Sequence, residues 1–306
     1  MRRRRPGLFW VGAGLMGLFA TIALLGPLLA PYEARLPVGP PLAPPTDGYP
    51  LGTNDLGQDT LSLLIYGART SLLVAVAVTA VSTVLSWGVG LTAGFFRPTE
   101  APLMMLSDLL LALPSIPLYL LVVTLVGPSL QNLVLALALL SWPAFARIVR
   151  SVVIEVRSAP YVEAARSLGG TRAHVARRHL LPATLDLLPT KLILTVRFAV
   201  FAEATLAFLG LADSGSVSWG TMLSNAFDDP LLFSRPVWPW LVFPPAVAIV
   251  TLILATTWLS TGIEGSIGGV PESVGAAAVE SGPHAEHTES REGAALTGPR
   301  RRSRSR

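Results

Sequence analysis

The stretch that decides the architecture is residues 161–182, which read YVEAARSLGGTRAHVARRHLLP. It is polar and strongly basic, yet long apolar segments flank it on both sides. Backbone and side chains of this polarity cannot be placed in hydrocarbon without a large energetic cost. We therefore expect the stretch to lie outside the lipid, where it meets either a soluble partner or lipid headgroups.

The composition is that of a membrane protein. Of the 306 residues, 51% are hydrophobic and only 14% are charged, and the mean hydropathy is +0.57. Soluble domains carry about 25% charged residues. Cysteine is absent, which excludes disulfides, thiol nucleophiles and cysteine-based zinc sites.

Six apolar segments are long enough to cross a bilayer, which takes about 20 residues in a helix. We therefore predict an all-α, polytopic membrane protein with six transmembrane helices. The transmembrane domain covers residues 8–263, after a basic N-terminus (1–7) and before a tail (264–306) whose Gly, Ala, Ser, Pro and charged residues predict disorder. The predicted spans are 8–30, 71–96, 101–126, 130–149, 190–211 and 237–263.

The arginines predict the orientation. With the N-terminus inside, the inner segments hold nineteen basic residues and the outer loops hold three, namely Arg35, Arg69 and Arg235. Basic residues are enriched in cytoplasmic loops. Both termini and the polar loop 151–189 are therefore predicted to be cytoplasmic.

Within the polar loop, the local signals indicate two short helices. Residues 161–168 favour a first helix, and Gly169 and Gly170 are typical of its C-terminal end. Thr171 can cap a second helix that runs to Leu180, which Pro182 is expected to end. The residues alone leave two interpretations open: a hairpin bound to headgroups, or a docking site for a soluble protein.

The outer loops carry structural signals. Asn54, Asp55 and Asp59 lack calcium-loop spacing, so they predict a turn and a helix cap. A short interfacial helix is expected around residues 56–65, because its leucines recur at helical spacing. Three tryptophans are interpreted as interfacial anchors; the alternative for loop 212–236 is contact with a delivery protein. These tryptophans are Trp219, Trp238 and Trp240.

Three charged residues lie well inside predicted spans, away from the span ends: Asp108, Arg197 and Glu203. Such charges are costly in a bilayer and are candidates for function. From their depths we predict that Asp108 pairs with Arg197 across two helices. The alternative is that the Arg197 side chain reaches the membrane–water interface and Asp108 faces a water-accessible gap between helices.

Enzyme signatures are missing from the sequence. It has no G-x-x-x-x-G-K-[ST], no H-E-x-x-H and no G-x-S-x-G. We therefore expect no catalytic residues, no metal and no cofactor bound by this chain.

An ordered series of motifs resembles one family, the dipeptide, oligopeptide and nickel permeases of ABC importers, specifically their C-type subunit. The polar loop resembles the E-A-A loop of that family, in the R-H-x-L-P form. Two places depart from the pattern, the end of the last span (259–264) and Arg197. The matching segments are Leu51–Asp59, Leu64–Leu72, Leu139–Pro143, Ala146–Arg147, Val149–Arg150, Tyr161–Arg166, Arg178–Pro182, Ala202–Ala204, Phe208–Leu211 and Ser218–Gly220.

The resemblance implies a transport subunit without an ATPase site of its own, in the bacterial cytoplasmic membrane. It implies a homologous second permease, two ATPase subunits that use ATP and Mg, and an extracytoplasmic solute-binding protein, and no nucleic acid. Peptides are the implied substrate; nickel or another small solute is the alternative, and outside the class a secondary transporter or channel. The implied ATPase-docking residues are Glu163, Ala164, Ala165, Arg166, Leu168, Gly169, His179, Leu181 and Pro182.

Overall fold

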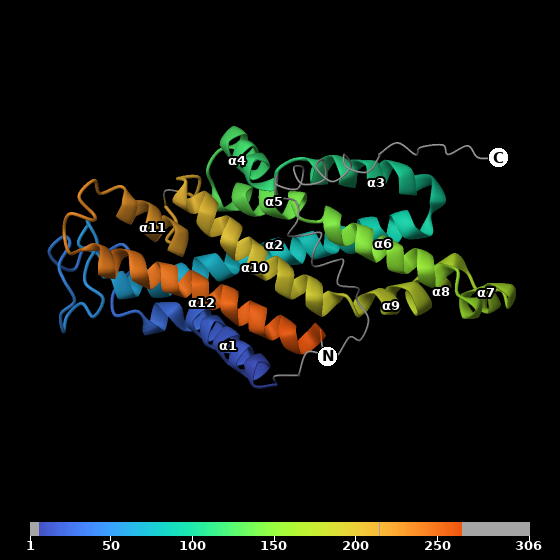
Figure 1. Cartoon of the computed structure of the whole chain (residues 1–306), viewed down its shortest axis with the longest axis horizontal. Helices are drawn as coiled ribbons and strands as arrows, with labels where there is room; N and C mark the ends of the chain where they lie inside the picture. Colours follow the sequence, from blue (N-terminus) through green and yellow to red (C-terminus); the bar gives the residue numbers. More distant parts are fainter. Residues whose placement is uncertain (1–5, 214, 265–306) are drawn as a thin grey trace, which may run out of the picture. The chain divides into compact units, whose positions relative to one another are not determined.

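The computed structural model describes residues 6–213 and 215–264 (Figure 1). Residues 265–306 of the predicted tail and residues 1–5 of the basic N-terminus lie outside these residues. The helices confirm the predicted all-α class. They are α1 Pro6–Leu29, α2 Thr60–Phe95, α3 Arg97–Ala112, α4 Ser115–Val126, α5 Leu130–Leu140, α6 Pro143–Arg157, α7 Pro160–Ser167, α8 Arg172–Val175, the π-helix η1 Ala176–Leu180, α9 Leu181–Leu185, α10 Leu188–Phe208, α11 Trp219–Phe227 and α12 Trp238–Glu264.

Within residues 6–213 and 215–264, four helical segments are long and apolar enough to cross a bilayer, or five if the bent pair α3 and α4 counts as one span. The remaining predicted span corresponds to α10, which carries three charged residues, Lys191, Arg197 and Glu203. The predicted count of six spans is thus not confirmed.

Helix α2 corrects the prediction of a separate interfacial helix. A single helix of 36 residues begins at Thr60, so the residues expected at the interface form its first turns. At about 1.5 Å per residue it is about 54 Å long, well beyond the hydrocarbon core. Asp59 caps it by accepting hydrogen bonds from the Ser62 backbone N–H (2.8 Å) and hydroxyl (2.7 Å). In the turn before the helix, Asn54 Oδ1 accepts a hydrogen bond from the Leu56 N–H. Both observations confirm the prediction of a turn and a helix cap.

The third predicted span is broken rather than continuous. Helices α3 and α4 meet at 96°, where Leu113 adopts an extended conformation (φ −87°, ψ 140°). Pro114 explains the break, because a proline disfavours the helical conformation in the residue before it and cannot donate a backbone hydrogen bond.

Helices α2 and α6 pack closely along a seam built on two glycines. A Cβ at Gly90 would lie 2.7 Å from the Ala146 carbonyl oxygen, and one at Gly94 would lie 2.6 Å from Val153 Cγ1. Glycines four residues apart form one face of a helix, and small residues let membrane helices approach closely. At the end of the seam, Arg157 Nη1 donates to the Gly94 carbonyl (2.9 Å) and the Phe95 carbonyl (3.3 Å), which satisfies the last carbonyls of α2.

The main core contains Trp219, which the sequence analysis placed at the interface. Its side chain is 1% exposed, its indole N–H donates to the Leu64 carbonyl (3.0 Å), and its ring packs edge-on against Phe19. The anchor prediction is wrong for this residue. Position 67 explains why: Gly67 lies against the indole ring and leaves room for it beside α2.

Candidate functional site

The polar loop is built on α7, which one buried side chain fixes to the transmembrane helices. Pro160 stands in its first turn, where its missing N–H costs nothing. Val162 is fully buried in a cluster with Val149 and Val153 of α6 and Trp87 of α2. The first helix of the predicted pair is thus confirmed, and it rests on the α2–α6 seam.

Two glycines end α7 in the way the sequence predicts. The Gly169 N–H donates to the Arg166 carbonyl and the Gly170 N–H to the Ala165 carbonyl, both at 2.9 Å. This pair of bonds is a Schellman motif. Gly169 has φ +90°, which only glycine adopts without strain. A Cβ at Gly170 would lie 2.6 Å from the Ala165 oxygen, so both positions require glycine.

The second helix begins as predicted but ends later. The Thr171 hydroxyl accepts a hydrogen bond from the His174 N–H (3.2 Å). The helix then continues through the π-helical turn η1 and α9 to Leu185, so the prediction that Pro182 ends it is wrong. In η1 the Leu181 N–H reaches back to the Ala176 carbonyl. A π-helical turn shifts the hydrogen-bond register, so the proline that follows is accommodated.

The side of the loop away from the bundle is open. Glu163, Ala164 and Arg166 are exposed, and Leu168 is 89% exposed, which is unusual for a leucine. Leu181 and Pro182 are also exposed. A polar surface that also exposes an apolar side chain is suited to contact with another protein.

His179 and Ala165 are less accessible than the rest of the predicted docking residues, since both are half-buried. The His179 ring lies 5.7 Å from the Tyr161 ring and 6.0 Å from the His174 ring, centroid to centroid. These three rings connect α7 to α8 and η1. His179 therefore lies within the joint between the two helical parts of the loop.

A side-chain hydrogen bond also ties the end of the loop to α2. Trp87 Nε1 donates to the Thr184 hydroxyl at 3.2 Å, and Val175 and Leu180 are buried in the same cluster as Trp87. The loop is therefore joined to α2 and α6 by apolar packing and by a hydrogen bond. No pattern in the amino-acid sequence marks Trp87 or Thr184 as part of this site.

The charges inside the predicted spans have different partners from those expected. Asp108 of α3 pairs with Arg147 of α6, not with Arg197. Nearby, Glu100 pairs with Arg150. The Asp108–Arg197 prediction is wrong because α3 packs along α6, which brings Asp108 beside Arg147. Arg147 was assigned only to the end of a span, and its spacing from Asp108 in the sequence carries no signal of contact.

Glu203 lies in the core at 2% exposure. Its Oε2 accepts a hydrogen bond from the Ser71 hydroxyl of α2 at 3.1 Å. Arg197 is half-buried on the same helix. In residues 6–213 and 215–264, no three His, Cys, Asp or Glu side chains form a group that could hold a metal ion.

The chain has relatives among known proteins. The family described as "Binding-protein-dependent transport system inner membrane component" matches residues 82–268. The chain is 33% identical to the probable peptide ABC transporter permease protein y4tQ of Sinorhizobium fredii, over 85% of this chain and 88% of that protein. It is 34% identical to the di/tripeptide transport system permease protein DppC of Pseudomonas aeruginosa, over 84% and 86%.

Among solved structures, the chain is similar to one from an inward-facing MetNI methionine ABC transporter. The TM-score is 0.49 and the identity 17%, over 66% of this chain and 96% of that one. The family match covers more than half of the chain, and the two relatives align over most of it. The chain therefore belongs to the family of inner membrane components of binding-protein-dependent transport systems.

Proposed function

We propose that the chain is the membrane subunit of an ATP-driven importer of di- and oligopeptides and that its loop 151–189 receives an ATPase subunit. The observation that carries the docking role is the geometry of α7. Helix α7 packs on α2 and α6 through Val162 and ends at two glycines. It exposes Leu168 on the side that faces away from these helices. The peptide substrate is supported by the names of the two relatives.

In this proposal the chain supplies no catalytic residue and binds no cofactor. ATP and Mg are used by two partner ATPases, whose closure on nucleotide would press on α7. The movement would pass to α2 and α6 through the buried cluster and the Trp87–Thr184 hydrogen bond. A ligand of the partner thereby biases one arrangement of the helices over another. A homologous second permease and an extracytoplasmic binding protein complete the assembly, with both termini of this chain cytoplasmic.

The docking role is tested by co-purification of the ATPase with the full chain. Leu168→Asp and Glu163→Lys are expected to reduce ATPase recovery at least tenfold, because the first puts a charge in place of the exposed apolar side chain and the second reverses the charge on the same surface. Leu36→Asp is the matched control, since Leu36 is a leucine exposed on the outer loop (52%). Full ATPase recovery and full uptake in both α7 variants would contradict the docking role.

The substrate is tested separately, by uptake into proteoliposomes that contain the whole transporter. Labelled dialanine is expected to accumulate only with ATP inside and binding protein outside, and unlabelled tripeptide should compete. The alternative, a nickel importer, predicts accumulation of nickel and no competition by peptides. That outcome would leave the docking role standing and remove the peptide assignment.

A further inference from the structure

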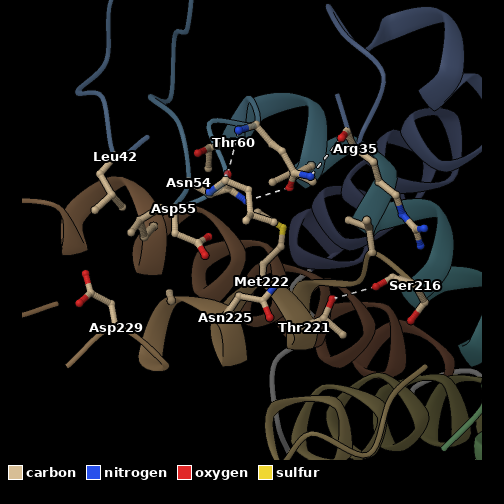
Figure 2. A pocket seen from close by; sticks show the side chains of 16 residues that line it. Arg35, Leu42, Asn54, Asp55, Thr60, Ser216, Thr221, Met222, Asn225 and Asp229 are labelled. Carbon is tan, nitrogen blue, oxygen red and sulfur yellow. Dashed lines mark hydrogen bonds between the residues drawn. The ribbon is translucent and has the colours of Figure 1, made fainter. Parts of the chain in front are cut away.

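Helix α2 gives a scale for the depth of the segments that pack beside it. Thr60, in its first turn, lines a cavity of about 220 Å³ together with residues of α11 (Figure 2). Trp87 lies about 40 Å further along the helix, and its indole N–H donates to the Thr184 hydroxyl of α9 at 3.2 Å. Thr184 is therefore level with the last third of α2, about 12 Å before that helix ends.

The arginines of η1 can be placed on the same scale. Arg177 and Arg178 lie about 10 Å from Thr184 along the helical path. Their direction is toward the end of α2, because Leu180, which follows them, is buried in the cluster that packs against the last turn of α2. The predicted span 71–96 ends at this level. The two arginines are therefore expected at the boundary between hydrocarbon and headgroups.

The guanidinium groups of Arg177 and Arg178 are open to a partner. Both residues are exposed, and in the part of the chain that the structure describes neither forms an ion pair. The two arginines of α6 that point to α3, by contrast, are each paired with a carboxylate. The carboxylates on the neighbouring elements are Glu155 of α6 and Asp186 after α9, and both are exposed. The arginines thus present two positive charges that an anion can neutralise.

Exposed leucines continue from these arginines toward α10. Leu181 and Leu185 of α9 are 37% and 45% exposed, and Leu192 in the first turns of α10 is 38% exposed. Leu181 and Leu185 are four residues apart, so they lie on one face of the helix. A surface that changes from arginine to exposed leucine over a short helical path matches the change from lipid headgroups to acyl chains.

We propose that η1 and α9 bind an anionic phospholipid of the cytoplasmic leaflet. Its phosphate contacts the guanidinium groups of Arg177 and Arg178, and an acyl chain lies along Leu181 and Leu185. Basic residues beside the cytoplasmic end of a transmembrane helix attract anionic lipids, and π-helical turns such as η1 are frequent at functional sites.

The lipid site and the ATPase-docking surface would then share the loop. Helix α7 meets the protein partner, and η1 with α9 meets the membrane. Leu181, which the family resemblance implies for ATPase docking, becomes a lipid contact. The lipid assignment rests on the proposed cytoplasmic position of the loop and not on the presence of an ATPase.

Binding of labelled phosphatidylglycerol to the purified full chain in detergent tests the proposal. We expect saturable binding, about tenfold tighter than that of phosphatidylcholine with the same acyl chains, because basic residues favour a lipid with net negative charge. Glycerol 3-phosphate carries the phosphate without acyl chains and should not displace the lipid. Equal affinity for the two lipids would overturn the proposal, and displacement by glycerol 3-phosphate would show a site for free phosphate instead.

Variants of the chain locate the lipid site. Arg177→Gln combined with Arg178→Gln is expected to weaken phosphatidylglycerol binding about tenfold, whereas lysine at both positions keeps the charges and should retain most of the binding. Leu185→Asn should weaken binding through the acyl chain. Arg35→Gln combined with Arg235→Gln is the matched control, because it removes the same charge from exposed arginines of the outer loops. Unchanged binding by the Arg177 and Arg178 glutamine variant would overturn the proposal.

Recovery of the ATPase distinguishes a lipid contact from a protein contact. The glutamine variant of Arg177 and Arg178 should co-purify with the ATPase as the unmodified chain does, and Leu168→Asp should bind phosphatidylglycerol normally. If the glutamine variant lost the ATPase but kept the lipid, the two arginines would belong to the docking surface and the lipid proposal would be wrong. A failure of lipid binding alone leaves the docking role of α7 standing.

Discussion

At the scale of single residues, the ion pair of Asp108 and Arg147 ties α3 to α6 on a surface that is open in the isolated chain. The side chains are 55% and 48% exposed, respectively. An exposed ion pair in water contributes about 0–1 kcal/mol. In a membrane the same surface meets lipid or another subunit, where a lone charge is far less favourable than a pair.

Removal of one charged side chain of the pair should therefore lower the stability of the chain more than removal of both. We expect Asp108→Asn to lower the thermal stability of the chain in nanodiscs, and Asp108→Asn with Arg147→Gln to recover most of the loss. Arg197→Leu should add to Asp108→Asn independently, because these residues are not paired. If Arg197→Leu rescued Asp108→Asn and Arg147→Gln did not, the assignment of partners would be wrong.

Gly169 offers a second test at this scale, because its requirement is conformational and not steric. A Cβ there would meet nothing within 4 Å, yet φ is +90°. Gly169→Ala is expected to destabilise the end of α7 by about 1–2 kcal/mol. Gly169→Asn should cost less, since asparagine tolerates this region better. Hydrogen exchange of the α7 amides measures both; equal protection in the three proteins would speak against a conformational role.

At the scale of elements, the α2–α6 seam carries the polar loop 151–189, and the close approach of the two helices depends on Gly90. We expect Gly90→Ala to destabilise the chain by about 1–3 kcal/mol, because the new methyl overlaps the Ala146 carbonyl and Val149. Gly88→Ala on the same helix is the control. It meets nothing within 4 Å and should be neutral or stabilising by up to about 1 kcal/mol. Thermal denaturation in one detergent compares them; equal effects would mean that the seam is not close-packed.

The elements also show what local sequence can predict. The end of α7 and the caps at Asp59 and Thr171 follow from short-range chemistry, and the structure confirms them. The effect of a proline is harder to predict from local sequence, because it depends on the surrounding structure. Pro114 breaks a span, whereas Pro182 lies inside continuous helical structure that adopts a π-helical turn.

Residues that depend on long-range contacts could not be placed from one sequence. Trp219 is buried because Gly67, far away in the chain, leaves room for its ring. Arg147 lies beside Asp108 only because α3 and α6 pack together. One cavity draws its wall from residues 35–63 and from residues 216–241, which are far apart in the sequence, so no local pattern marks it.

At the scale of the whole molecule, α2 joins a cavity to the polar loop 151–189. Its first residue, Thr60, lines the cavity, and Trp87 near its other end packs in the cluster beneath the polar loop. A rigid helix can link events at its two ends if it has two discrete positions. This role depends on the cavity and the loop lying on opposite sides of the membrane.

The last prediction concerns the orientation of the chain in the membrane. Because the chain has no cysteine, a single introduced thiol is the only one that can be labelled. Ser167→Cys places one thiol in the docking loop, and Ser234→Cys places one in the outer loop; both serines are exposed. A membrane-impermeant maleimide should label Ser234→Cys in intact cells and Ser167→Cys only after the membrane is opened. The excess of basic residues in loop 151–189 is the reason to expect this. The reverse labelling pattern would place the loop outside, away from ATP, and would remove the docking proposal together with the orientation.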